Sequence, residues 1–362
     1  MRKTCGIISP FFNHTSEAKI ARNLIDSLAS MNANFSVDDI SESFEFLPKN
    51  KERYFSKLVS KNTDSVNGRR IVFNSVLSSI SLCSYDNFIP YFSIKANNLP
   101  AYYYKILNNK EKILVYNNFT KKVICDSGIS ENKVIIVPPT INSRIIKSAN
   151  KFKINGKRKF SFLSVVNLRK DSNWLSVVKS FYDSFSSDDD ICLILKANDS
   201  NYSKYNKLNI AREIDAEKKR HNSDVPPVIL ISSPLTDQEM AGLYESCDFF
   251  VRISGVNSGL SFIEAFASGL ICIGPSDGGC REILDRNTGF MIRKDKEKRI
   301  YSKDEFNGTT YNIYDGFHLS EIMQWVVNNF DNLKEKTAKE RKIILSQFDQ
   351  NIVGQKFLKS LR

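Results

Sequence analysis

The chain has 362 residues, of which 41% are hydrophobic and 25% charged, a balance that excludes general disorder and fibrous classes. Its length predicts two domains with cores of their own, and no apolar run approaches the roughly 20 residues that a membrane-spanning helix needs. Lys and Arg outnumber Asp and Glu by 52 to 40, a net charge of +12, which is typical either of an ordinary solvated surface or of a surface that meets an anionic partner.

Apolar runs alternate with amphipathic segments in the first 150 residues, a pattern typical of alternating strands and helices. Strands are predicted at residues 6–12, 113–116 and 133–138, with helices at 17–29 and from Thr120. The polar, basic stretch 148–159 is typical of a linker between domains.

Beyond this linker the alternation is clearer. Strands are predicted at 160–166, 191–196, 228–232, 248–253 and 270–274, and helices at 174–185, from Thr236, at 260–268 and at 334–342. Thr236 and Glu239 have the spacing of a capping box, which marks the start of a helix. Such repetition predicts a parallel sheet covered by helices on both faces, with ligands at the carboxyl ends of its strands.

The seven cysteines include no C-x-x-C pair, and the three histidines lie far apart. This pattern predicts buried thiols in a reducing cytoplasm, and neither a disulfide framework nor a zinc site. Asp188 and Asp190 form a D-x-D, but they lie in a polar loop that precedes a strand, so we interpret them as a solvated turn. We therefore expect no metal site.

The strongest functional signal follows the fourth strand after the linker. A loop of small residues leads through Asn257, Ser258 and Gly259, and a helix begins near Leu260. Small residues let backbone N–H groups approach a ligand, and a helix N-terminus attracts anions, so this is a candidate phosphate site. Glu264 follows among apolar residues, and a buried carboxylate needs a hydrogen-bond partner. The vicinal hydroxyls of a ribose, or a residue of the neighbouring domain, would supply one.

This segment resembles the donor-nucleotide site of family 4 (group 1) glycosyltransferases, retaining enzymes of the two-domain GT-B fold. The stretches that match the family's pattern in order and spacing are Gly259-Leu260, Glu264-Ala-Phe-Ala-Ser-Gly269, Gly278-Gly279 and Glu282. Asn167-Leu-Arg169-Lys170 stands where the family carries an Arg/Lys pair for the donor diphosphate. Two positions depart from the pattern: Val256 replaces a Glu that contacts the donor sugar, and His14-Thr15-Ser16-Glu17 replaces a Gly-Gly turn.

The resemblance implies an α/β protein of the GT-B fold, with two Rossmann-like domains whose parallel sheets face a central cleft. We expect an acceptor-binding domain at 1–150, a donor-binding domain at 158–330, and C-terminal helices at 331–362 that pack back on the first domain. It also implies a metal-independent, hexosyltransferase-like enzyme that needs no cofactor and takes a nucleoside-diphosphate sugar, with a UDP-sugar favoured.

The resemblance assigns three kinds of site residue. They are the catalytic residues Arg169, Lys170 and Glu264; the donor-binding residues Asn167, Ser258, Gly259, Leu260, Asp277, Gly278 and Gly279; and the cleft residues His14 and Asn257. Each also has a structural alternative: an exposed pair at a strand end for Arg169 and Lys170, a simple turn for Asp277 to Gly279, and a structural histidine for His14.

The basic charge bears on the acceptor. Residues 1–150 hold 20 basic and 12 acidic side chains, which is +8 of the total +12, with the densest cluster at 49–70. A lipid-linked glycan of O-antigen or capsule assembly would suit a cytoplasmic enzyme in peripheral contact with the inner membrane face. A DNA acceptor, as in phage enzymes that modify bases, would suit the same charge, and Val256 leaves open a catalytically idle relative that binds a nucleotide sugar or a partner.

Overall fold

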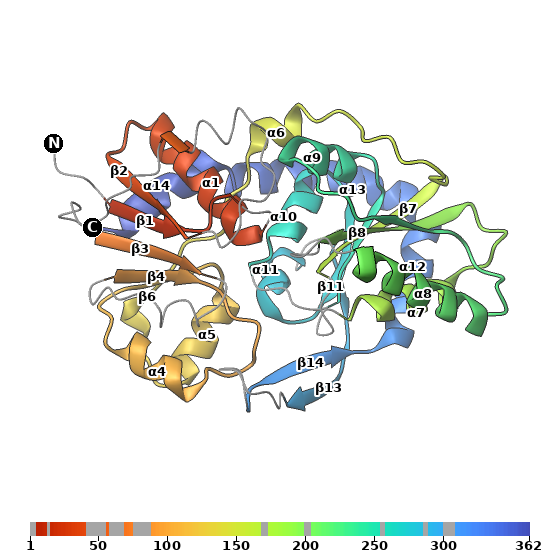
Figure 1. The fold of residues 1–362 in the computed structure, drawn as a ribbon, viewed down its shortest axis with the longest axis horizontal. Helices are drawn as coiled ribbons and strands as arrows, with labels where there is room; N and C mark the ends of the chain where they lie inside the picture. Colours follow the sequence, from red (N-terminus) through yellow and green to blue (C-terminus); the bar gives the residue numbers. More distant parts are fainter. Residues whose placement is uncertain are drawn as a thin grey trace.

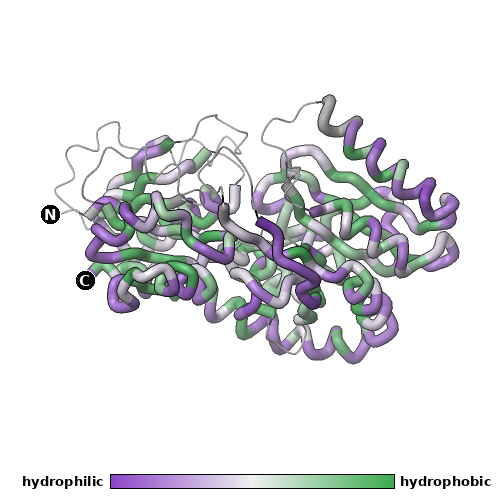
Figure 2. The backbone as a smooth tube through the Cα atoms, turned by 90° about the horizontal axis from the view of Figure 1, so that it is seen from below, coloured by the Kyte–Doolittle hydropathy of each residue, from purple (hydrophilic) through white to green (hydrophobic). Residues whose placement is uncertain are grey.

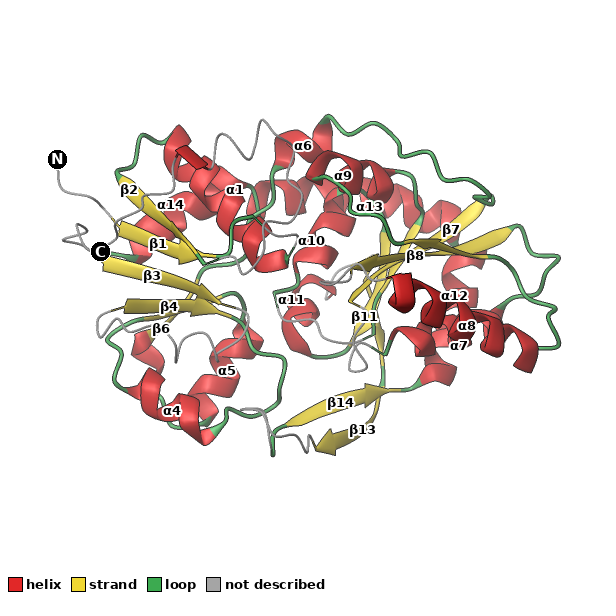
Figure 3. Ribbon diagram, viewed as in Figure 1, coloured by secondary structure: helices red, strands yellow, loops and turns green. Residues whose placement is uncertain are grey.

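The computed structural model describes residues 5–12, 15–40, 56–57, 69–74, 88–167, 173–198, 204–253, 258–284, 289–299 and 308–362. These residues form two parallel α/β domains with a small hairpin beneath them (Figures 1 and 3). Most of the basic cluster at 49–70 lies outside the described residues.

The first domain is built on a six-stranded parallel sheet of order β2-β1-β3-β4-β5-β6. Its strands are β1 (Cys5–Ser9), β2 (Phe35–Asp39), β3 (Arg69–Asn74), β4 (Phe88–Phe92), β5 (Ile113–Val115) and β6 (Val134–Ile136). Its helices are α1 (Ser16–Ser30), α4 (Ala101–Asn108), α5 (Asn118–Asp126) and α6 (Ser143–Lys147). The predicted strand 6–12 ends earlier than expected, at Ser9, because Pro10 has no N–H to continue the ladder.

The second sheet has six parallel strands in the order β12-β11-β10-β7-β8-β9, the doubly wound arrangement of dinucleotide-binding folds. Its strands are β7 (Phe160–Asn167), β8 (Ile191–Asn198), β9 (Val228–Ile231), β10 (Phe249–Val251), β11 (Ile271–Pro275) and β12 (Gly289–Ile292). Its helices are α7 (Trp174–Ser184), α8 (Lys204–Arg220), α9 (Asp237–Glu245), α10 (Leu260–Ala267), α11 (Arg281–Leu284) and α12 (Gly316–Asn328). The five strands predicted after the linker are confirmed, and so is the capping box of α9.

Both sheets are covered by helices, and the hydrophobic residues gather along the strands (Figure 2). Five of the cysteines, including Cys192 and Cys272, are buried with free thiols, as predicted, and Cys125 is half-buried. Burial raises the pKa of the Cys5 thiol to about 12, so it stays protonated at neutral pH. Asp189 caps the turn at Ser186, where its carboxylate accepts the backbone N–H at 2.8 Å.

The last two helices, α13 (Phe330–Gln347) and α14 (Gln350–Ser360), lead the chain back to the first domain. Helix α14 lies so close to α1 that a Cβ on Gly354 would fall 2.1 Å from the Ser27 hydroxyl. Ile141 exchanges backbone hydrogen bonds with Phe348 and Gln350, at 2.9 and 3.1 Å. The C-terminal segment therefore packs against the first domain, through α1 and the backbone at Ile141.

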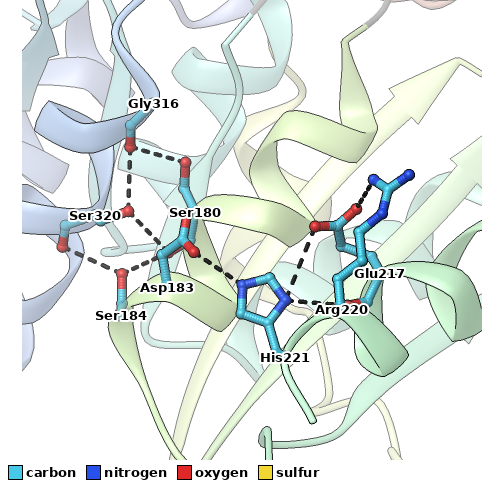
Figure 4. A network of polar contacts seen from close by, with 8 residues as sticks. All are labelled: Ser180, Asp183, Ser184, Glu217, Arg220, His221, Gly316 and Ser320. Atoms are coloured by element: carbon cyan, nitrogen blue, oxygen red, sulfur yellow. Dashed lines mark hydrogen bonds and ion pairs between the residues drawn. The ribbon is translucent and has the colours of Figure 1, made fainter. Parts of the chain in front are cut away.

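Polar contacts join α7 to α8 and α12 (Figure 4). The Ser180 hydroxyl donates to the Gly316 carbonyl at 2.9 Å, at the start of α12. Directly after α8, both ring nitrogens of His221 face acceptors, Nε2 at 2.8 Å from Asp183 Oδ1 and Nδ1 at 3.0 Å from the Glu217 carbonyl. Burial alone would lower the pKa of His221, but these two hydrogen bonds and the nearby carboxylates outweigh it and raise the pKa.

We expect the stabilising effect of His221 to depend on pH. Because its pKa is raised in the folded state, its contribution is complete below the unfolded value of about 6.5 and is lost as the pH rises through the folded value. His221→Gln should lower the free energy of unfolding by about 0.2–1 kcal/mol at pH 5.5, a small effect because Asp183 is half exposed, and by less at pH 9. Urea denaturation at both pH values measures this, and an equal loss at both would contradict it.

Candidate active site between the two sheets

Each sheet contains a point at which the strand order reverses, and ligands of open parallel sheets bind outside the carboxyl ends of the strands there. In the first sheet the reversal lies at β1 and β3, and α1 begins in the connection that follows β1. In the second sheet it lies at β7 and β10, which are direct neighbours in the sheet. Figure 1 shows α10 and α11, which follow β10 and β11 in the chain, between the two sheets, where the domains meet.

The loop before α10 lies against the loop that follows β11. Gly259 is the N-cap of α10, with a φ of +75°, and a Cβ there would lie 2.8 Å from the Gly279 carbonyl oxygen. Only glycine fits this combination of left-handed backbone and close approach. The Ser258 hydroxyl accepts a hydrogen bond from the Leu260 N–H at 3.3 Å. The N-cap residue itself, Gly259, makes no side-chain capping bond to α10. The structure thus brings the predicted residues 258–260 and 278–279 together.

Asp277 is held by the hairpin of β13 (Lys294–Arg299) and β14 (Thr310–Tyr314). Its two carboxylate oxygens accept short hydrogen bonds from the Asn312 amide and the Tyr314 hydroxyl. Burial and the adjacent Asp277 carboxylate raise the pKa of Tyr314, so the hydroxyl remains a donor at neutral pH. Asp277 is therefore a fixed support of the turn at Gly278 and Gly279.

Glu264 is buried, at 8% exposure, and pairs with a residue of the first domain. Its carboxylate forms an ion pair with the Lys19 ammonium from the first turns of α1, which also lies 3.8 Å from Asp237 on α9. Burial alone would lower the pKa of Lys19, but attraction to Glu264 and Asp237 outweighs it and raises the pKa. Next to this pair lies a pocket of about 10 Å³, room for about one water molecule, which Tyr244 also lines.

A second carboxylate of the matching pattern also crosses between the domains. Glu282 on α11 accepts the backbone N–H of Asn118 at 2.6 Å, at the first turn of α5. A carboxylate is favoured at this position because the helix N-terminus carries unpaired N–H groups and the positive end of the helix dipole. Lys19 and Asn118 thus make two of the contacts between the carboxyl edges of the two sheets.

Arg252, which directly follows β10 at the strand-order reversal, was not predicted from the sequence. Its guanidinium Nη1 lies 3.4 Å from the Ser261 hydroxyl in the first turn of α10, and Cys280 and Glu17 lie within its electrostatic reach. Burial lowers the pKa of Arg252, because a charged guanidinium loses solvation there. The available signal was a lone arginine placed immediately after a buried apolar strand.

Several predicted residues lie outside the described part of the chain. These are His14, Arg169, Lys170 and Asn257, together with Val256. Asn167 ends β7 in register with Asn198 on β8. Across the described ranges, no three His, Cys, Asp or Glu side chains are grouped as metal ligands. None of the described helices combines the length and apolar character needed to span a bilayer.

No protein-family profile matches the chain, and no curated protein sequence matches it. Solved structures do match. A glycosyltransferase from Rickettsia africae has a TM-score of 0.70 at 14% identity, covering 99% of this chain and 98% of that one. Anabaena Alr3699/HepE, solved with UDP and glucose, has a TM-score of 0.69 at 9% identity over 99% of both chains. An E. coli protein bound with UDP-2-fluoro glucose has a TM-score of 0.63 at 10% identity, over 99% of this chain and 98% of that one. With its two Rossmann-like parallel sheets, the chain has the GT-B fold.

Proposed function

We propose that the chain is a retaining, metal-independent glycosyltransferase that transfers a hexose from a UDP-sugar. The observation that carries the proposal is the contact between Lys19 and Glu264, which joins the strand-order reversals of the two sheets. A ligand bound at this point would touch both domains. The Anabaena and E. coli structures, which hold UDP with glucose and a UDP-sugar analogue, support a nucleotide sugar as that ligand.

Cationic and backbone groups would bind the donor diphosphate. The N–H groups of Gly259 and Leu260 lie at the start of α10, Arg252 lies beside its first turn, and Arg169 and Lys170 follow β7 in the sequence. When the bond from the sugar to phosphate breaks, negative charge grows on the leaving diphosphate, and fixed positive groups stabilise it there. A metal ion is therefore not needed for this task.

Glu264 would bind the ribose hydroxyls, and the turn at Asp277, Gly278 and Gly279 would lie near the sugar. For Glu264 to bind the ribose, the Lys19 ammonium must share the carboxylate or release it. In the retaining mechanism that the resemblance implies, the acceptor attacks the face that the diphosphate leaves, and the leaving phosphate takes the acceptor's proton. Closure of the domains around the donor excludes water, which would otherwise hydrolyse it.

The acceptor would bind the first domain, which carries +8 of the net charge of +12. We infer an anionic, lipid-linked glycan of surface-polysaccharide assembly, met by a cytoplasmic enzyme at the inner membrane face. A membrane surface attracts basic segments, so binding to vesicles that contain anionic lipid is expected to fall with salt. Retention on DNA that falls steeply with salt would instead favour a nucleic-acid acceptor.

The test is nucleotide release from a panel of nucleotide sugars, with and without glycan acceptors. We expect release from a UDP-sugar and a much slower release by Glu264→Ala, with Glu264→Gln as a variant of the same shape. No release from any donor would contradict an enzyme and favour an idle relative. Equal release by wild type and both variants would contradict the assignment of Glu264 instead.

A further inference from the structure

The β13–β14 hairpin belongs to the second domain by sequence but reaches the first. It follows β12, and in Figure 1 it extends from below β11 toward the loop that precedes α4. All six residues of β13 are exposed, so the strand is not held by burial of its side chains. The described residues of the hairpin form several hydrogen bonds with the first domain.

Two of these bonds involve the backbone of the hairpin. The Asn97 N–H of the first domain donates to the Thr310 carbonyl at 2.8 Å, and the Thr310 N–H donates to Asn98 Oδ1 at 2.9 Å. Because both the donor and the acceptor of Thr310 are used, the start of β14 is fixed against the loop after β4.

A side-chain relay continues from this contact into the candidate site. Asn97 Nδ2 donates to Asn312 Oδ1 at 3.0 Å, and Asn312 Nδ2 donates to Asp277. The orientation of the Asn312 amide is fixed, since a carboxylate can accept from its nitrogen but cannot donate to its oxygen. Tyr314 holds the second oxygen of Asp277. The relay therefore connects the first domain to the turn at Gly278 through three side chains.

Glu297 on β13 strengthens the same junction. Its carboxylate accepts hydrogen bonds from Thr310 and Asn97 and lies 3.1 Å from the Lys294 ammonium. These bonds to the charged form lower the pKa of Glu297 to about 2, so the carboxylate is ionised throughout the neutral range.

We propose that the β13–β14 hairpin is an interdomain clasp, in which Asn97 and Asn312 are positioning residues that fix the turn at Asp277, Gly278 and Gly279 when the domains close. An effect of the clasp on donor binding rests on the proposed function, whereas the contact between the two domains does not. Asn118 and Asn97 both belong to the first domain, and they contact different elements of the second: Asn118 donates to Glu282 on α11, and Asn97 donates to Asn312 on β14. If the clasp holds the domains closed, its loss exposes the Asn118 amide even though no atom near Asn118 is changed.

Hydrogen exchange in the full-length, ligand-free protein tests the clasp. We expect Asn312→Ala and Asn97→Ala to accelerate exchange about tenfold in peptides that cover Asn118, since opening of the domains exposes that amide. Lys298→Ala is the matched control, because Lys298 is an exposed residue of β13 outside the relay, and it should leave exchange at Asn118 unchanged. Acceleration confined to the loop around Asn97 would overturn the clasp, because it would show a purely local contact.

UDP binding, measured by titration calorimetry, tests the link to the donor. We expect each alanine variant to weaken UDP binding about tenfold, and the double variant to match Asn312→Ala alone, because both residues act through one relay. Asn312→Gln is expected to weaken UDP binding as Asn312→Ala does. A purely structural defect would instead change UDP binding in proportion to the loss of stability. Additive losses would overturn the relay. If wild type fails to bind UDP, the proposed donor is wrong, and hydrogen exchange alone decides the clasp.

Discussion

Replacing Arg252 with methionine is expected to slow nucleotide release from the donor by about 10²- to 10³-fold, the effect of removing one fixed group that stabilises charge in a transition state. Arg252 follows β10 at the strand-order reversal and lies beside the first turn of α10. Because Arg252 is half-buried, its attraction to a diphosphate is less screened than it would be in water. Initial rates with a saturating UDP-sugar measure the effect.

Two further measurements separate charge from structure in this prediction. Arg252→Met should weaken UDP binding much more than uridine binding, since only UDP carries the diphosphate, and Arg252→Lys should recover part of the loss. Arg293→Met is the matched control, because Arg293 is exposed and pairs with Asp315 on the second domain. An equal loss for UDP and uridine would indicate a structural role and contradict the assignment.

Five of the six strands of the second sheet could be predicted because each is a short apolar run between polar segments. Other elements give no such signal. All six side chains of β13 are charged and exposed, and it is a strand only because it pairs with β14. Strand β4 contains Pro90, which argues against a central strand, although it lies between β3 and β5.

The candidate site was predictable to the extent that it depends on local spacing. Gly259 combines a left-handed backbone at the N-cap of α10 with a close approach to Gly279. The glycines at both positions in the sequence indicate this geometry. The partner of Glu264 was not predictable. Lys19 is 245 residues away in the sequence, and the contact exists only because the two domains pack with their carboxyl edges together. The spacing of residues in a motif does not predict how two domains pack against each other.

Replacing Lys19 with methionine is expected to lower the free energy of unfolding by about 3 kcal/mol, the usual cost of removing one partner from a buried ion pair. The change leaves Glu264, which is 8% exposed, without its cation and close to the similarly charged Asp237. Urea denaturation monitored by circular dichroism measures the loss. Lys121→Met is the matched control, since Lys121 pairs with an exposed glutamate and should cost less than about 1 kcal/mol.

The double variant Lys19→Met/Glu264→Gln decides what the pair contributes. If the cost of Lys19→Met is the penalty of an uncompensated carboxylate, neutralising Glu264 as well should restore most of the stability, and an additive loss would contradict this cause. UDP then separates stability from binding. A ligand that binds only the folded state stabilises it by an amount that grows with its concentration relative to its Kd. If Glu264 binds the ribose, UDP should stabilise Lys19→Met at least as strongly as wild type, because Lys19 no longer competes for the carboxylate, and should stabilise the double variant much less.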